Sequence, residues 1–167
     1  MKKQIELLSR KHNKKEFDCG KEMLDSYFQN QANQDLKRKL SACFVWEDVD
    51  TGLIQGFYTL SNNSIPLNII PDKWRRILPV SYTSIPATLL GRLAIDKRFQ
   101  GKGIGQILLM DALKRSYDIS DEIDSFAVVV DPLDDEAEKY YEKFGFIKLP
   151  DRKKMFIAMQ TLKSLFE

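Results

Sequence analysis

Hydrophobic and polar positions alternate along this chain in two periods, one typical of strands and the other of helices. Short apolar or alternating runs predict strands over residues 5–8, 42–46, 53–60, 87–95, 125–130, 146–149 and 155–159. Apolar residues three or four positions apart predict helices over residues 21–33, 104–117 and 134–144. This order of elements predicts an α/β (α+β) fold, in which a mixed, mostly antiparallel sheet is flanked by helices.

Turn and capping residues set the limits of these elements. Asp18 is placed to cap the first helix, and residues 48–52 form a turn that makes the strands on either side a hairpin. Gly145 is placed to end the helix before it. Three prolines predict irregular chain over residues 61–85, with a short helix around Trp74.

Size and composition narrow the class of protein. The chain has 167 residues, 43% of them hydrophobic and 30% charged, which suits one globular domain over residues 1–167. Apolar runs fall short of the ~20 residues that span a bilayer, and no signal peptide is expected at the start. Cys19 and Cys43 suggest neither a disulfide framework nor a zinc site, so we expect a cytoplasmic protein that binds no metal and no membrane. The net charge of +2 says little about partners.

A glycine-rich turn carries the most specific motif. Gln100-Gly101-Lys102-Gly103-Ile104-Gly105 lies between a predicted strand and a predicted helix. Glycines let backbone N–H groups approach a diphosphate, the start of a helix adds further donors, and Arg98 and Lys102 add positive charge. The spacing fits neither a Walker turn nor a dinucleotide fingerprint. A loop that only turns tightly remains the alternative.

The residues around this turn resemble motif A of the GNAT acetyltransferases, (Arg/Gln)-x-x-Gly-x-(Gly/Ala), which also follows a strand such as Leu93-Ala94-Ile95. The resemblance implies a GNAT fold with acetyl-CoA as cosubstrate. It implies that the turn holds the CoA diphosphate, and that the strand presents backbone groups to the pantetheine arm in a wedge beside the strand ending at Val130. The expected cofactor-binding residues are Leu93, Ala94, Ile95, Arg98, Gln100, Gly101, Lys102, Gly103, Ile104 and Gly105.

A second segment is similar to the family's Tyr-x-x-x-Gly-Phe pattern, which falls here on Tyr141, Gly145 and Phe146. Acyl transfer from a thioester leaves a CoA thiolate that needs a proton. A tyrosine, with an ordinary pKa of about 10, is a competent donor at neutral pH. The resemblance implies this role for Tyr141. The alternative is that Tyr140, Tyr141 and Phe144 are core aromatics at helical spacing.

The remaining chemistry-bearing residues favour direct transfer. His12 lies in a basic segment far from the turn, where we expect a surface residue, and neither cysteine is near a candidate base. A Cys/His acyl-enzyme is therefore unsupported. An α-amine, with a pKa near 8, needs less help from a base than a lysine amine, so the absence of an obvious base favours an α-amine acceptor.

A narrower resemblance concerns the acceptor. Phe17-Asp18-Cys19-Gly20, the following Leu24-Asp25-Ser26-Tyr27-Phe28, and Leu90-Gly91-Arg92-Leu93-Ala94-Ile95-Asp96 are similar to the GNAT toxins of bacterial toxin–antitoxin modules. The resemblance implies acetylation of the α-amine of aminoacyl-tRNA, a small DNA-binding antitoxin as partner, and a homodimer. Residues 61–85 match this group least clearly.

An RNA substrate would need a basic surface, and the candidates are Lys37, Arg38, Arg75, Arg76 and Arg92. Taken singly, each of them is better explained as an ordinary solvated position. Two other functions stay open: a GNAT that acetylates a small amine or a protein N-terminus, and a CoA-binding module without catalysis.

Overall fold

The computed structural model describes residues 5–150 and 153–167, and the chain divides into two compact units. Unit 1 is Met1–Ser61 with Gly91–Ala112, and unit 2 is Asn62–Leu90 with Leu113–Glu167. The elements in chain order are β1 (Ile5–Leu7), α1 (Glu22–Asn30), α2 (Ala32–Lys37), β2 (Ala42–Glu47), β3 (Ile54–Pro66), η1 (Leu67–Ile69), α3 (Asp72–Arg75), β4 (Ser84–Ile95), η2 (Lys97–Phe99), α4 (Ile104–Ile119), β5 (Ala127–Val130), α5 (Asp135–Lys143), β6 (Ile147–Lys148), β7 (Met155–Ala158) and α6 (Met159–Phe166).

The strands form a seven-stranded sheet in the order β1-β2-β3-β4-β5-β7-β6. Antiparallel pairs join β1 to β2, β2 to β3, β5 to β7 and β6 to β7, whereas β4 and β5 are parallel. The predicted mixed, mostly antiparallel sheet is therefore confirmed. The parallel register runs from Ala87 opposite Ala127 to Leu90 opposite Val130, and β4 then continues to Ile95.

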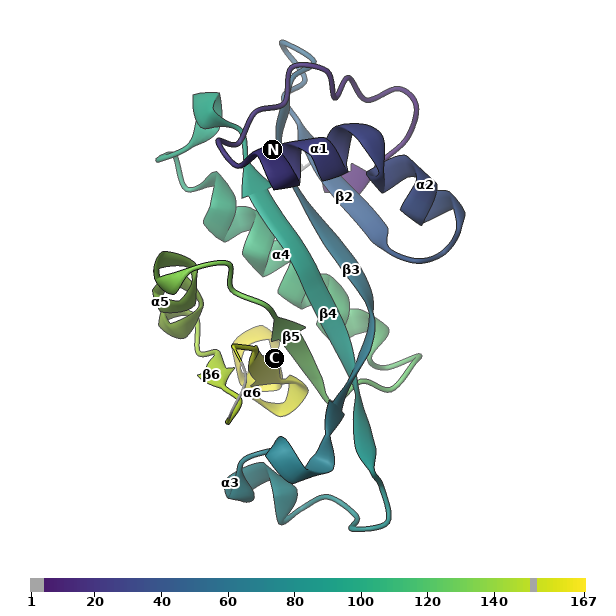
Figure 1. Cartoon of the computed structure of the whole chain (residues 1–167), viewed down its shortest axis with the longest axis vertical. Helices are drawn as coiled ribbons and strands as arrows, with labels where there is room; N and C mark the ends of the chain where they lie inside the picture. Colours follow the sequence, from purple (N-terminus) through teal and green to yellow (C-terminus); the bar gives the residue numbers. More distant parts are fainter. Residues whose placement is uncertain (1–4, 151–152) are drawn as a thin grey trace. The chain divides into compact units, whose positions relative to one another are not determined.

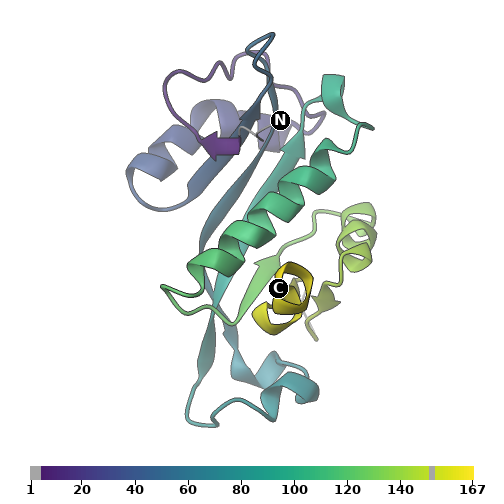
Figure 2. The same cartoon turned by 180° about the vertical axis from the view of Figure 1, so that it is seen from behind.

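In unit 1, helices cover both faces of the strands. Helices α1 and α2 lie on one face (Figure 1) and α4 lies along the other (Figure 2). Phe28 of α1 stacks on Phe57 of β3 with ring centroids 4.3 Å apart, and Phe17 packs edge-on against both rings. These rings lie in a core whose buried apolar side chains come from α1, α2, β2, β3 and β4.

The first half of α4 approaches the sheet closely at Gly56. A Cβ at this position would lie 2.5 Å from Leu108 Cδ1 and 2.8 Å from the carbonyl oxygen of Ala94, so only glycine fits. The Tyr58 hydroxyl donates a hydrogen bond of 2.6 Å to Asp111 of α4. These contacts fix the start of α4, and hence the glycine-rich turn before it, relative to β3 and β4.

Unit 2 has a core of its own around β5. All four residues of β5 are buried, and Ala127 and Val129 pack with Ile85 and Ala87 of β4 and with Phe156 of β7. Trp74 joins this core from α3 and meets Phe126 edge-on, with ring centroids 5.9 Å apart. The predicted short helix around Trp74 is thus confirmed.

Three predicted features were wrong. Asp18 does not cap the first helix: the N-cap is Lys21 without a side-chain cap, and the Asp18 carboxylate accepts the Gly20 N–H instead. The predicted helix over 21–33 is two helices, which meet at Gln31. Residues 61–85 are less irregular than predicted, because β3 continues to Pro66 and β4 begins at Ser84.

The other boundaries agree with the sequence to within a few residues. Asp134 caps α5 by accepting the Ala137 N–H at 2.8 Å, and Gly145 follows the helix with a φ of +95°. Helix α6 was not predicted, although Met159 and Leu162 are buried three positions apart in its sequence.

Candidate active site

The glycine-rich turn adopts a conformation that its sequence requires. Gly101 and Gly103 both have a φ of +77°, in the left-handed region that residues with a Cβ rarely adopt. No atom lies within 4 Å of the point where a Cβ would stand at either glycine. The glycines therefore serve the backbone turn and leave its outer side open.

Backbone N–H groups are available where the turn enters α4. The Ile107 N–H bonds to the Gly103 carbonyl, so the N–H groups of residues 104–106 belong to the first helical turn, which has no intrahelical acceptor for them. Such donors, together with the positive end of the helix dipole, bind phosphate oxygens well. By the chemistry of these donors, the turn fits a diphosphate.

Asp96 is the centre of a hydrogen-bond network that holds the turn from behind. Its carboxylate is 1% exposed and accepts four hydrogen bonds: from the Asp18 N–H, the Arg98 N–H, and Arg98 Nε and Nη2. Burial pushes the pKa of Asp96 upward, but the hydrogen bonds from Arg98 and Asp18 outweigh it and hold this pKa below its usual value.

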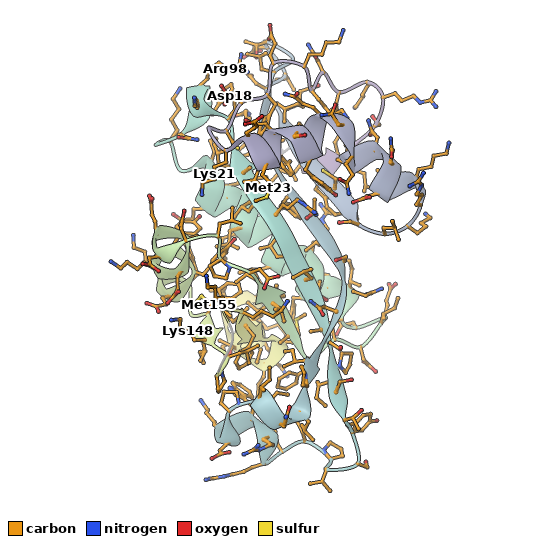
Figure 3. All side chains as sticks on the ribbon, viewed as in Figure 1. Asp18, Lys21, Met23, Arg98, Lys148 and Met155 are labelled. Carbon is orange, nitrogen blue, oxygen red and sulfur yellow. The ribbon has the colours of Figure 1, made fainter. Side chains whose placement is uncertain are left out.

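This network changes the expectation for Arg98. Its guanidinium binds Asp96 in a bidentate pair and also donates to the Glu16 carbonyl. Figure 3 shows Arg98 beside Asp18, at the same end of unit 1. The positive charge of Arg98 is thus compensated inside the protein, and the structure supports a role in holding the turn more directly than a contact with phosphate.

Gln100 joins the two chain segments that meet here. Its side-chain amide donates to the carbonyl of Ile95 at 2.9 Å and to the carbonyl of Cys19 at 3.1 Å. The Lys97 N–H also donates to the Asp18 carbonyl at 2.8 Å. Residues 16–20 are therefore attached to the turn by hydrogen bonds.

The other predicted cofactor residues lie around the turn. Leu93, Ala94 and Ile95 form the end of β4, with Ala94 buried and its neighbours half-buried. Lys102 is exposed, and its ammonium nitrogen lies 5.7 Å from the centroid of the Phe99 ring. Within unit 1, the structure thus brings the predicted residues 93–105 together in one strand–turn–helix segment.

Tyr141 lies in unit 2, in the last turn of α5, and is 9% exposed. Its ring meets Phe146 edge-on, with centroids 5.2 Å apart, and Tyr140 at 5.7 Å. Burial, with a smaller contribution from Tyr140, raises the pKa of Tyr141 above its ordinary value of about 10. The hydroxyl therefore stays protonated at neutral pH, as a proton donor requires.

Arg92 is held in a defined orientation on β4. Its guanidinium carbon lies 3.4 Å from the centroid of the Tyr27 ring, and the Tyr27 hydroxyl donates to Asp35 of α2 at 2.9 Å. Burial and the bond to Asp35 raise the pKa of Tyr27 to about 12. Arg92 is thus a half-buried cation stacked on a neutral ring.

The other candidate RNA contacts are exposed and separate into the two units. Lys37 ends α2 and Arg38 follows it, both in unit 1. Arg75 and Arg76 lie at the end of α3 in unit 2, where Arg75 pairs with Asp72. Exposure is what an RNA contact needs, but ordinary solvated positions meet the same condition.

The prediction that His12 is a surface residue was wrong. His12 is 5% exposed, its Nδ1 accepts the Ser9 N–H, and its Nε2 lies 3.0 Å from Glu6 Oε1. It is a structural residue of the N-terminal segment. Burial raises the pKa of Cys19 to about 11 and that of Cys43 to about 12, so neither thiol is activated as a nucleophile.

Two features are absent from the described part of the chain. Residues 5–150 and 153–167 contain no group of three or more His, Cys, Asp or Glu side chains placed to hold a metal ion. Among the same residues, no helix combines the length and the apolar character needed to cross a membrane.

Sequence reasoning missed Asp96 as a site residue. Its position directly after the apolar strand 87–95 and two residues before Arg98 was a usable signal, because a buried carboxylate needs a nearby cation. The contact with Asp18, 78 positions earlier, had no signal in the sequence.

Comparison with known proteins gives consistent similarities. A family model described as "Acetyltransferase (GNAT) domain" matches residues 80–160. A "tRNA-acetylating toxin" of Mycobacterium tuberculosis (strain ATCC 25618 / H37Rv) is 34% identical over 150 residues, which cover 89% of this chain and 87% of the relative. A "Probable toxin TacT" of Sinorhizobium fredii (strain NBRC 101917 / NGR234) is 32% identical over 163 residues, covering 93% and 90%.

Solved structures show the same similarity. The complex of AtaT with acetyl-methionyl-tRNAfMet superposes with a TM-score of 0.91 at 26% identity, covering 99% of this chain and 100% of that one. AtaTR bound with acetyl-CoA gives a TM-score of 0.86 at 26% identity, covering 98% of both chains. A Tyr→Phe mutant of AtaT bound to the C-terminus of the antitoxin AtaR gives 0.81 at 25% identity, covering 98% and 97%.

Proposed function

The chain belongs to the GNAT acetyltransferases, in the family of the tRNA-acetylating toxins, and we propose that it transfers the acetyl group of acetyl-CoA to the α-amine of aminoacyl-tRNA. One observation carries the proposal: a relative whose name specifies tRNA acetylation is 34% identical across 89% of this chain. The AtaT complex with acetyl-methionyl-tRNAfMet supports the same acceptor.

Binding of acetyl-CoA begins at the glycine-rich turn. The N–H groups of residues 101–106 bind the diphosphate, while Asp96 and Gln100 hold the turn in place from behind. Leu93, Ala94 and Ile95 offer the backbone of the β4 end to the pantetheine arm. This assignment is supported by the geometry of the turn and by the acetyl-CoA complex of the similar AtaTR.

Transfer is direct. The neutral α-amine attacks the thioester carbonyl carbon, a C–N bond forms, and the C–S bond breaks as the thiolate leaves. Tyr141 gives its phenolic proton to that thiolate, and the new ammonium group loses a proton to water. The phenolate then regains a proton from solvent, which returns the enzyme to its starting state.

The raised pKa of Tyr141 is compatible with this step. An ordinary thiol has a pKa of about 8.5, so a tyrosine of higher pKa would be a poor donor to a thiolate in water. Burial disfavours every anion, however, and a thiolate formed in surroundings as dry as those of Tyr141 has a raised pKa for the same reason. The pKa difference between donor and acceptor is therefore smaller than a comparison of the raised tyrosine pKa with the solution pKa of a thiol suggests.

The tRNA backbone needs cations outside the acyl-transfer centre. Arg92, stacked on Tyr27, and the exposed residues Lys37, Arg38, Arg75 and Arg76 supply them. We further propose a cytoplasmic, single-domain protein that forms a homodimer and is inhibited by a small DNA-binding antitoxin. The AtaT complex with the C-terminus of AtaR supports the last point.

The test compares charged with deacylated tRNA. The purified protein is incubated with acetyl-CoA and either tRNA, and the products are read by mass spectrometry. We expect acetylation of the amino acid on charged tRNA only, and growth arrest when the protein is expressed in bacteria. Acetylation of a polyamine or peptide instead, or acetyl-CoA binding without transfer, would contradict the proposed acceptor.

Tyr141→Phe tests the proton donor in the same assay. We expect the rate of acetylation to fall by about 10²–10⁴-fold, while acetyl-CoA still binds and growth arrest is lost. Tyr82→Phe, at a 54% exposed position, is the matched control and should leave the rate unchanged. A Tyr141→Phe enzyme with the wild-type rate would remove Tyr141 from the mechanism.

A further inference from the structure

Helix α5 carries two adjacent tyrosines, Tyr140 and Tyr141, and the proposed proton transfer uses only Tyr141. The hydroxyl oxygen of Tyr140 is buried and has no hydrogen-bond partner; among the described residues only Thr59 Oγ1 shares this condition. The Tyr140 ring packs edge-on against Phe144 at 5.1 Å and Tyr141 at 5.7 Å between centroids. The ring is thus held by aromatic contacts, and its hydroxyl takes no part in them.

A buried hydroxyl without a partner costs stability, because it has left water without gaining a new hydrogen bond. Phenylalanine would keep both ring contacts at no such cost. Burial also raises the pKa of Tyr140, so the group is a neutral phenol that can both donate and accept. A group of this kind is explained when its partner comes from outside the chain.

The place of Tyr140 indicates which partner that is. It precedes Tyr141, the proposed donor to the CoA thiolate, by one residue, and the two rings touch. The sulfur is the end of the pantetheine arm, which carries amide carbonyl and N–H groups along its length. The contact of Tyr140 with the proposed proton donor thus favours the pantetheine arm, rather than the diphosphate, as the source of the missing partner.

We propose that Tyr140 is a second ligand-binding tyrosine of the acyl-transfer site, and that its buried hydroxyl forms a hydrogen bond with an amide group of the pantetheine arm of acetyl-CoA. This inference rests on the proposed function. It gives Tyr140 a role in binding and leaves the proton transfer to Tyr141.

The experiment contrasts two Tyr→Phe variants, one that loses a hydroxyl without a partner and one that loses a hydroxyl with a partner. In Tyr140→Phe the lost hydroxyl has none, and we expect the dissociation constant for acetyl-CoA in calorimetry to rise about fivefold while the melting temperature stays equal or rises. KM for acetyl-CoA should rise similarly, with kcat within about twofold of wild type.

Tyr58→Phe is the contrast, because the Tyr58 hydroxyl donates to Asp111 at 2.6 Å. Loss of this hydrogen bond should lower the melting temperature. An unchanged dissociation constant in Tyr140→Phe would overturn the inference. So would a melting temperature lowered as in Tyr58→Phe, since the hydroxyl would then have a partner inside the protein or a bound water.

Failure of the proposed function gives a different result. Wild-type protein that binds no acetyl-CoA would overturn both proposals together. Wild-type protein that binds and transfers, with Tyr141→Phe inactive and Tyr140→Phe unchanged in affinity, would overturn the role of Tyr140 alone.

Discussion

Replacing Asp96 with asparagine would test whether this buried carboxylate holds the glycine-rich turn. Asparagine has the same shape, and its Oδ1 can still accept from one side. Its amide nitrogen, however, would face donors that now bind Oδ2, the Asp18 N–H and Arg98 Nη2. The variant thus loses the negative charge and places the asparagine NH₂ group against two other hydrogen-bond donors, but it leaves no cavity.

The expected magnitude follows from these contacts. A hydrogen bond to a charged group contributes ~1.5–3 kcal/mol, and two of the four bonds are lost. The Arg98 side chain is 42% exposed, so its lost bond is largely replaced by water and contributes little. The Asp18 N–H is the main loss, which gives a decrease of about 2–3 kcal/mol in the free energy of unfolding. For a chain of this length that corresponds to a melting temperature lower by roughly 5–10 °C.

Urea unfolding at several pH values measures this difference and its sign. The folded-state pKa of Asp96 lies below its usual value, so its contribution is complete above pH ~4 and disappears as the pH falls through the folded-state pKa. The gap between wild type and Asp96→Asn should therefore be largest near neutral pH and shrink in acid. Asp50→Asn, at an exposed turn position, is the control and should have no effect. A difference below ~0.5 kcal/mol at pH 7, or one that does not change with pH, would refute the reasoning.

Three further results are expected. Gly103→Ala should lower the free energy of unfolding by about 1–2 kcal/mol, because its φ is +77°, and should raise KM for acetyl-CoA at least tenfold. Gly52→Ala, at a φ of +72° in the hairpin turn, is the control and should show only the loss of stability in the same melting and rate assays. The rate of acetylation should rise with pH as the α-amine loses its proton near pH ~8. It should then stay level to pH ~10, because burial raises the pKa of Tyr141 and keeps its phenol protonated. A fall in rate before pH ~9 would contradict a buried phenol donor. Arg92→Gln should weaken aminoacyl-tRNA binding and reduce the slope of log K against log salt by about one unit in filter binding, and an unchanged slope would remove Arg92 from the RNA surface.

What the sequence predicts well depends on local chain geometry. The strand, turn and helix over residues 87–119 follow from an apolar run, two glycines with positive φ and a helical period, all within one short segment. The start of α5 near Asp134 and its end before Gly145 are equally local. These features needed no information about the rest of the chain.

What the sequence predicts poorly depends on contacts between distant segments. Asp18 looks like a helix cap, but its backbone N–H is held by Asp96 and its carboxylate by Gly20, which places the cap at Lys21. His12 looks exposed in its basic segment, yet Glu6 and Ser9 bind both ring nitrogens and bury it. For Asp18, the contact with a distant residue overrides the local preference. For His12, the hydrogen bonds are short-range, but they follow no strand or helix period that the sequence would reveal.

The contrast between local geometry and long-range contacts also explains which groups of the turn can bind an anion. The positive charge of Arg98, just before the turn, is neutralised by Asp96, and the Gln100 amide is occupied by the carbonyls of Ile95 and Cys19. Besides the exposed Lys102, the groups left for a diphosphate are backbone N–H donors, whose direction is set by φ angles and by the packing of α4 at Gly56. Fixed dipoles of this kind bind an anion with little reorganisation, because the protein has already ordered them in folding. Affinity for acetyl-CoA should therefore depend more on the conformation of Gly103 than on the charge of Lys102. Lys102→Ala should raise KM for acetyl-CoA less than Gly103→Ala does, and the reverse order would show that side-chain charge, rather than backbone geometry, holds the diphosphate.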